Sequence, residues 1–156
     1  MIYFPRDYQS AITGAILHHP RYNLWSGMGT GKTVATLTAI DILLALGEVS
    51  RVLVVAPLRV ANLTWPMEVK GWEQFRWMRV ANLRTEQGQR AFLTGKAHIY
   101  TINYEGLNSL VSLVEMRGKK PLPYDVVIFD ELTRAKNPGS KRINHYRRNV
   151  PRVERQ

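Results

Sequence analysis

Short runs of apolar residues alternate along this chain with longer segments in which apolar residues recur every three or four positions. The first pattern is typical of buried strands and the second of amphipathic helices. Mainly apolar runs lie at residues 22–25, 51–57, 77–83, 98–101 and 125–129, and helical spacing covers residues 8–19, 32–46, 58–71, 85–94 and 104–116. Because strands and helices alternate, the sequence predicts an α/β domain with a parallel sheet and helices on both faces.

Several boundaries of these elements carry local signals. Gly47 is a typical stop for the helix that begins at Lys32, and Thr85 is placed to cap the helix over residues 85–94. Pro66 lies inside the segment 58–71, where it predicts either a break or a new first turn. Residues 118–123 contain glycine, two lysines and two prolines, and therefore predict a loop before the last strand.

A glycine-rich stretch separates the first predicted strand from the helix that begins at Lys32. It consists of Ser26, Gly27, Met28, Gly29, Thr30, Gly31, Lys32 and Thr33. A strand, a glycine turn and a helix in this order are typical of a phosphate-binding loop, because glycines let consecutive N–H groups surround an anion. We expect Lys32 to reach the β- and γ-phosphates of ATP and the Thr33 hydroxyl to bind Mg²⁺. Ser26 replaces the first glycine of the pattern, and a turn that binds nothing is the alternative.

Asp130 and Glu131 directly follow the last apolar run. Parallel sheets bind ligands beyond the carboxyl ends of their strands, where the phosphate loop also lies. We therefore expect Asp130 to hold Mg²⁺ through water and Glu131 to orient the water that attacks the γ-phosphate. Without the phosphate loop upstream, such an acidic pair would more simply be a solvated turn.

Composition narrows the class of protein. A chain of 156 residues suits one domain, and its lack of cysteine excludes disulfides and cysteine-based metal sites. The four histidines have no metal-binding spacing, and no apolar run approaches the roughly 18–20 residues of a membrane span. The N-terminus lacks the basic-then-apolar order of a signal peptide, so a cytoplasmic protein without a membrane partner is the expectation.

The net charge of +10 is concentrated near the C-terminus. Residues 134–156 contain eight lysines and arginines but a single acidic residue, whereas the rest of the chain is nearly balanced. These cations could contact DNA phosphates in a salt-dependent way, or they could belong to a poorly ordered tail. We predict that they belong to a poorly ordered tail.

Five segments, taken in order, resemble the Swi/Snf-like DNA translocases of helicase superfamily 2, especially their phage and bacterial members. They are Pro-Arg-Asp-Tyr-Gln at residues 5–9, Met-Gly-Thr-Gly-Lys-Thr at 28–33, the strand and Pro-Leu turn at 52–58 followed by Trp65, Thr-Ile-Asn-Tyr-Glu at 101–105, and Asp-Glu-Leu-Thr-Arg-Ala-Lys-Asn at 130–137. The ordered set is far more specific than any one of its members.

The resemblance implies a RecA-like P-loop lobe over residues 1–142, with 143–156 as the basic tail. In such a lobe Gln9 reads adenine, the stretch 26–33 binds ATP, Thr33 and Asp130 hold Mg²⁺, and Lys32, Asp130 and Glu131 are catalytic. The residues placed near the DNA backbone are Arg59, Thr101, Asn103 and Tyr104. The implied setting is the cytoplasm of a bacterial or phage-infected cell.

Two departures from the family pattern affect this interpretation. Thr133 stands where relatives carry a histidine that couples nucleotide state to DNA. The chain also ends soon after the Asp-Glu strand, before a further central strand and before the second RecA-like lobe that supplies arginine fingers. We therefore expect a truncated or split lobe, weak or inactive alone, whose second lobe belongs to another chain.

Alternatives remain at the level of function and of single residues. The chain could be a non-catalytic nucleotide- or DNA-binding module that completes a partner, whereas Gln9 and residues 134–137 argue against an AAA-type motor. Arg59 could simply be solvated, Tyr104 could be core, and Gln9 could be a surface helix position. Tyr3 and Phe4 are expected to pack against the protein rather than stack on adenine. Trp65, Trp72 and Trp77 are expected to pack in the core or between lobes rather than serve as platforms for bases.

Overall fold

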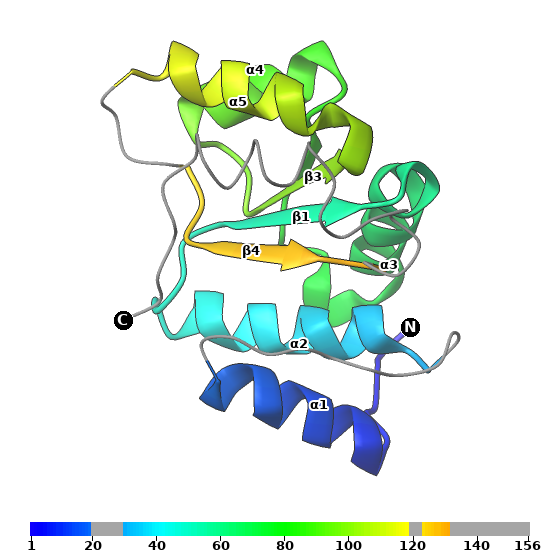
Figure 1. Cartoon of the computed structure of the whole chain (residues 1–156). Helices are drawn as coiled ribbons and strands as arrows, with labels where there is room; N and C mark the ends of the chain where they lie inside the picture. The colour runs from blue at the N-terminus through cyan, green and yellow to red at the C-terminus, as the bar shows by residue number, and fades with distance from the viewer. Residues whose placement is uncertain (20–29, 119–122, 132–156) are drawn as a thin grey trace.

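The computed structural model describes residues 1–19, 30–118 and 123–131 (Figure 1). The predicted first strand at 22–25, Ser26, Gly27, Met28 and Gly29 of the phosphate loop, Thr133 and the basic tail lie outside the described residues.

The core of the fold is a parallel four-stranded sheet in the order β2-β3-β1-β4. The strands are β1 (Val52–Ala56), β2 (Val80–Asn82), β3 (Ile99–Asn103) and β4 (Val126–Phe129). Every residue of β1 and β3 is buried, as expected for central strands covered on both faces. The predicted parallel α/β sheet is therefore confirmed.

Helices cover both faces of this sheet (Figure 1). The described residues form α1 (Asp7–His18), α2 (Lys32–Ala45), α3 (Trp65–Gly71), α4 (Glu86–Thr94) and α5 (Leu107–Met116). Apolar side chains of α2 and α3 pack with Val52 and Val54 of β1, while those of α4 and α5 pack with Leu53 and Val55 on the opposite face. Alternating side chains of this one buried strand thus pack into both halves of the core, one on each face of the sheet.

One predicted strand is shorter in the structure, and two predicted helices contain turns of another helical type. The strand expected over 77–83 is reduced to β2, because the Met78 N–H donates to Phe75 O and closes a turn before it. The helix expected over 58–71 is helical throughout those residues, and it includes a π-helical turn at Val60–Thr64. Pro66 has no N–H to continue the helical ladder, so α3 takes it into its first turn. The helix expected over 104–116 opens with a 3-10 turn at Tyr104–Gly106.

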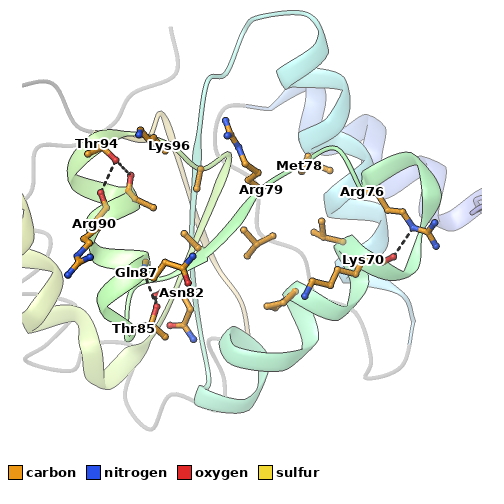
Figure 2. A pocket seen from close by; sticks show the side chains of 17 residues that line it. Lys70, Arg76, Met78, Arg79, Asn82, Thr85, Gln87, Arg90, Thr94 and Lys96 are labelled. Atoms are coloured by element: carbon orange, nitrogen blue, oxygen red, sulfur yellow. Dashed lines mark hydrogen bonds between the residues drawn. The ribbon is translucent and has the colours of Figure 1, made fainter.

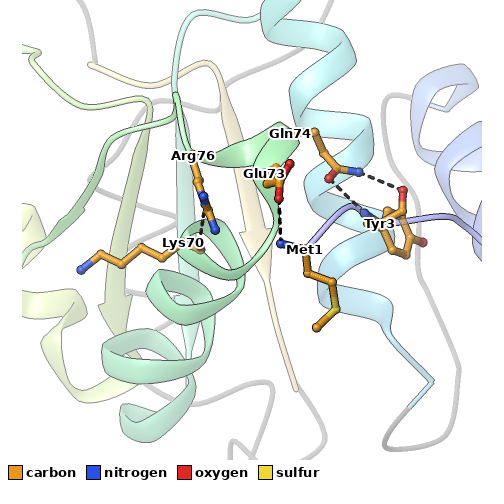
Figure 3. Close-up of polar contacts among 6 residues, drawn as sticks. All are labelled: Met1, Tyr3, Lys70, Glu73, Gln74 and Arg76. Carbon is orange, nitrogen blue, oxygen red and sulfur yellow. Dashed lines mark hydrogen bonds and ion pairs between the residues drawn. The ribbon is translucent and has the colours of Figure 1, made fainter.

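The N-terminal segment is fastened to the turn after α3 (Figure 3). The Met1 ammonium pairs with Glu73, and Gln74 exchanges two hydrogen bonds with the backbone of Tyr3. The Tyr3 ring is buried and meets the Trp72 ring edge-on at 5.4 Å between centroids. Tyr3 therefore packs as expected, whereas Phe4 is 80% exposed, so the expectation that it packs is wrong.

Because all four strands are parallel, the segments that follow them emerge at one edge of the sheet. Residues 57–59 follow β1, Tyr104 follows β3, and Asp130 with Glu131 follows β4. The N-terminal end of α2 lies toward the carboxyl end of β4 (Figure 1). None of the helices in the described ranges is long and apolar enough to cross a membrane.

Candidate functional site

Gly31 forms the junction between the phosphate loop and α2. Its φ of 68° is left-handed, a conformation that side chains rarely adopt, and a Cβ there would lie 2.3 Å from Gln9 Nε2. Lys32 and Thr33 are the first two residues of α2, where backbone N–H groups have no helical partner. This arrangement suits an anion at the helix N-terminus.

Gln9 lies against the end of this loop, and α1 positions it there. Its side chain is 7% exposed, accepts a hydrogen bond from the Arg6 N–H at 2.9 Å, and donates to Thr30 O at 3.4 Å. A surface helix position, the plainer interpretation of Gln9, is therefore wrong. The amide oxygen caps the start of α1, the amide nitrogen joins α1 to the loop, and the contact of Gln9 with adenine stays a prediction.

Thr13, which the sequence interpretation did not single out, supports the same junction. It is 7% exposed, and its hydroxyl donates to Ala35 O in the first turn of α2 at 3.0 Å. The available signal was a polar residue beside Ile12 on the apolar side of α1. Gln9 and Thr13 together hold the start of α2 from one helix.

Asp130 is held at the carboxyl end of β4 by three hydrogen bonds. Its N–H donates to Val55 O at 2.8 Å, the Tyr104 hydroxyl donates to its C=O at 2.7 Å, and the Trp65 indole N–H donates to Oδ2 at 3.0 Å. Among the described residues, no donor reaches Oδ1. The carboxylate is thus fixed in orientation with one oxygen still available.

Glu131 follows in an unusual backbone conformation. Its φ of 51° is left-handed, and it is the one non-glycine residue of the described ranges with a positive φ. Such a conformation costs on the order of 1–3 kcal/mol and is found mainly where function requires a particular side-chain direction. The left-handed backbone therefore sets the direction of the half-buried Glu131 side chain, and it lowers the stability of the fold.

The Tyr104 hydroxyl faces these two acidic residues. Burial raises the pKa of Tyr104 far above its ordinary value, and the charges of Asp130 and Glu131 raise it further. The hydroxyl therefore stays protonated and remains the donor to Asp130 O. Tyr104 is buried, as its plainer interpretation predicts, but its polar end belongs to the site.

Trp65 is the principal residue whose contact the sequence did not predict. It was expected in the core and is 1% exposed, yet its indole N–H reaches Asp130 across 65 positions of sequence. In the sequence, Trp65 was noted only because a tryptophan after the Pro-Leu turn resembles the family pattern. Its contact with the Asp130 carboxylate is visible only in the folded structure.

The four residues expected near DNA have different environments. Arg59 is exposed just beyond the carboxyl end of β1. Thr101 is fully buried within β3, and Asn103 is 4% exposed with its Nδ2 donating to Glu105. Tyr104 bonds Asp130, as described above. Arg59 is therefore the member of this set whose side chain lies at the surface.

The donor set suits a metal that arrives with a nucleotide. Within the described ranges, no group of three or more histidines or acidic residues could hold a metal by itself. Mg²⁺ in nucleotide sites takes one or two protein oxygens and completes its shell with phosphates and water. Asp130 Oδ1 and the Thr33 hydroxyl are oxygens of that kind.

A separate cavity of about 1020 Å³ lies between α3, β2 and α4 (Figure 2). Its lining has no acidic residue and includes five cations, Lys70, Arg76, Arg79, Arg90 and Lys96. Such a surface favours anions. None of the predicted catalytic or nucleotide-binding residues lines it, so it is distinct from the site around Lys32 and Asp130.

Comparisons with known proteins agree with this architecture. Residues 2–153 match the family model ResIII, described as "Type III restriction enzyme, res subunit". The chain is 41% identical over 136 residues to "Putative protein p41" of Acyrthosiphon pisum secondary endosymbiont phage 1, an alignment that covers 85% of this chain and 29% of that protein.

Among solved structures, the fold is similar to the Sulfolobus solfataricus SWI2/SNF2 ATPase core in complex with dsDNA. The TM-score is 0.70 at 21% sequence identity, and the match covers 91% of this chain and 29% of that one. The chain therefore spans less than a third of the length of either protein.

Proposed function

Since this chain belongs to the family described as "Type III restriction enzyme, res subunit", we propose that it serves as the ATP-binding first lobe of a DNA-dependent ATPase. Its fold is that of a RecA-like lobe of helicase superfamily 2, which confirms the resemblance recognised in the sequence. The observation that carries the proposal is the common edge of the sheet, toward which the start of α2 and the residues after β4 both project.

At this edge each residue has a separate task. Lys32 neutralises the β- and γ-phosphates, and the first N–H groups of α2 receive their oxygens. Thr33 and Asp130 would hold Mg²⁺, which would neutralise charge on the leaving phosphates when bound. Glu131 accepts a hydrogen bond from the attacking water and orients it in line with the bond that breaks. Gln9 would contact the adenine, and by the sequence pattern the glycine-rich residues 26–29 would bind phosphate.

DNA is the second ligand in this proposal. The solved neighbour is a complex with dsDNA, and Arg59 is exposed beside the candidate nucleotide site. Arg59 would contact a backbone phosphate, while the buried Thr101, Asn103 and Tyr104 would shape the segment that approaches DNA. The chain would act in the cytoplasm of a bacterial or phage-infected cell, together with a second RecA-like lobe.

A non-catalytic module that completes a partner is the less favoured function. Such a module would not require an ordered carboxylate at Asp130 or the left-handed backbone at Glu131. The retention of Lys32, Thr33 and both acidic residues supports an ATPase lobe.

Ligand-dependent thermal unfolding of the purified chain tests this function. At about 100 times the dissociation constant, Mg·ADP should stabilise the fold by about 2.7 kcal/mol and raise the Tm by roughly 5–10 °C. Lys32→Ala should abolish this rise because the phosphates lose their cation. Asp130→Asn should retain the response to ADP alone and lose the additional effect of Mg²⁺.

Lys96→Ala provides the matched control, because Lys96 lines the separate cavity. It should respond to Mg·ADP like the wild-type chain. A wild-type chain with no response, or a Lys32→Ala variant with an undiminished one, would contradict nucleotide binding at this loop.

A further inference from the structure

We infer that Trp65 and Tyr104 are positioning residues that link the DNA-facing segments to the magnesium-binding carboxylate of Asp130. This inference rests on the proposed function and adds a route by which DNA alters the nucleotide site. The two side chains pack in different hydrophobic clusters of the core, and each donates a hydrogen bond to Asp130.

Each hydrogen bond to Asp130 comes from a different segment at the carboxyl edge of the sheet. Val55 O belongs to β1, which leads into the turn at residues 57–59. Trp65 begins the helix that follows this turn, and Tyr104 follows Asn103 at the end of β3. The segments resembling DNA-contacting elements are therefore the segments that hold Asp130.

Trp65 determines which carboxylate oxygen is available. Its N–H occupies Oδ2 at 3.0 Å, and because the indole is 1% exposed it has little freedom to swing away. Oδ1 is then the oxygen directed to a metal or its water. Partners that orient a metal ligand in this way commonly affect metal affinity by 10- to 100-fold.

Tyr104 acts on the backbone of the same residue. Its hydroxyl donates to Asp130 O at 2.7 Å, one bond before the left-handed Glu131. The carbonyl that Tyr104 holds belongs to the peptide joining Asp130 to Glu131. Tyr104 therefore helps to set the directions of both acidic side chains.

A continuous helical path connects Trp65 to the predicted phosphate contact. The Ala61 N–H donates to Pro57 O at 2.9 Å, and the Trp65 N–H donates to Val60 O across the π-helical turn. A π-helical turn is less regular than an α-helix and is often found at functional sites. A shift of the turn around Arg59 on phosphate binding would therefore reach the indole and change its hold on Oδ2.

Trp72 offers a matched control for this contact. It lies at the other end of α3, and its indole N–H also donates to a carboxylate, Glu68 Oε2, at 2.6 Å. Replacing either tryptophan by phenylalanine removes one N–H and retains an aromatic ring. Of these two tryptophans, only Trp65 donates to Asp130.

The test measures binding of a fluorescent ADP analogue with and without Mg²⁺, in the absence and presence of a short DNA duplex. Trp65→Phe should weaken the Mg²⁺-dependent part of binding roughly 10-fold and reduce its change on adding DNA, while metal-free binding stays unchanged. Tyr104→Phe should act in the same direction. Trp72→Phe should behave like the wild-type chain.

A second measurement uses the wild-type chain alone. In an ¹⁵N–¹H spectrum of the wild-type chain, the Trp65 indole signal should shift on adding Mg·ADP, and the Trp72 signal should not. Wild-type binding with a static Trp65 signal, or equal effects of the two tryptophan variants, would overturn the inference alone. A wild-type chain that binds no nucleotide would overturn the proposed function, and this inference with it.

Discussion

At the scale of the residue, His98 gives this fold a local dependence on pH. Its Nδ1 accepts a hydrogen bond from the Arg79 N–H at 2.9 Å, and its ring meets Trp77 edge-on at 5.0 Å. Desolvation by burial lowers the pKa of His98, and the charges of Arg79 and Arg51 lower it further. The folded chain therefore prefers the neutral ring.

The sign of the pH effect follows from this shift. Unfolded His98 takes up a proton near its ordinary value of 6.5, before the folded ring does, so the free energy of unfolding decreases as the pH falls below about 6.5. The loss is complete below the folded pKa, because both states are then protonated. Since the ring is only half-buried, we expect less than about 1 kcal/mol.

His98→Asn isolates this contribution, because an asparagine oxygen can accept from Arg79 without titrating. Urea unfolding at pH 7.5, 6.5 and 5.5 should show the wild-type midpoint falling faster than that of the variant. Carboxylates contribute equally to both proteins, so the difference between the two curves reports His98. Parallel curves across this range would contradict the prediction.

At the scale of the element, the contact of α4 with β2 depends on Gly88. A Cβ at Gly88 would lie 1.8 Å from Asn82 O and 3.0 Å from Thr85 Oγ1, the hydroxyl that caps α4. The helix can approach the strand this closely only because the position has no side chain. Gly14, in the middle of α1, has no other atom within 4 Å of its ideal Cβ.

The two glycines therefore predict opposite effects of the same substitution. Gly88→Ala should destabilise the fold by about 1–3 kcal/mol, because backbone would have to move. Gly14→Ala should stabilise it by about 0.5–1 kcal/mol, because alanine is the better helix former and restricts the unfolded chain. Urea unfolding measures both. Equal effects would mean that α4 does not lie against β2 as the structure has it.

What the sequence predicts about elements follows from local chemistry. Mainly apolar runs predicted the approximate positions of the four parallel strands, and Thr85 was confirmed as the cap of α4, accepting from the Gly88 N–H at 3.0 Å. Trp77 was wrongly included in a strand and expected to pack. It is 48% exposed, because its indole donates to Asp41 from the turn before β2. The hydrogen bond of an indole N–H can determine whether a tryptophan is buried or exposed, and the spacing of apolar residues does not predict that bond.

Contacts between segments that are distant in the chain could not be predicted from the sequence. The phosphate-loop and Asp-Glu patterns predicted a site, but the sequence did not contain the strand order β2-β3-β1-β4 that brings β4 beside β1. The bond from Trp65 to Asp130 depends on that order, and the bond from Thr13 to Ala35 depends on the docking of α1 against α2. Such pairs arise from packing, which local propensity does not specify.

At the scale of the whole molecule, the last prediction concerns which steps of the ATPase reaction this lobe performs and which require a second lobe. This chain covers 29% of its phage relative and 29% of the solved ATPase core. By resemblance, the arginine fingers belong to a second lobe, and such a finger accelerates phosphoryl transfer by about 10³- to 10⁵-fold. Nucleotide binding should therefore be a property of this lobe, and rapid turnover a property of the longer protein.

Phosphate release in the presence of duplex DNA provides the measurement. The 156-residue chain should bind Mg·ATP yet release phosphate about 10³-fold more slowly than a longer, two-lobe ATPase core of the SWI2/SNF2 type under the same conditions. A Lys32→Ala variant should remove what turnover remains, which distinguishes the lobe's own activity from a contaminating ATPase. DNA-stimulated turnover by the 156-residue chain at the rate of the longer protein would mean that a single lobe contains every group the reaction needs. The arrangement around Asp130, Trp65 and Tyr104 would then be a complete active site rather than half of one.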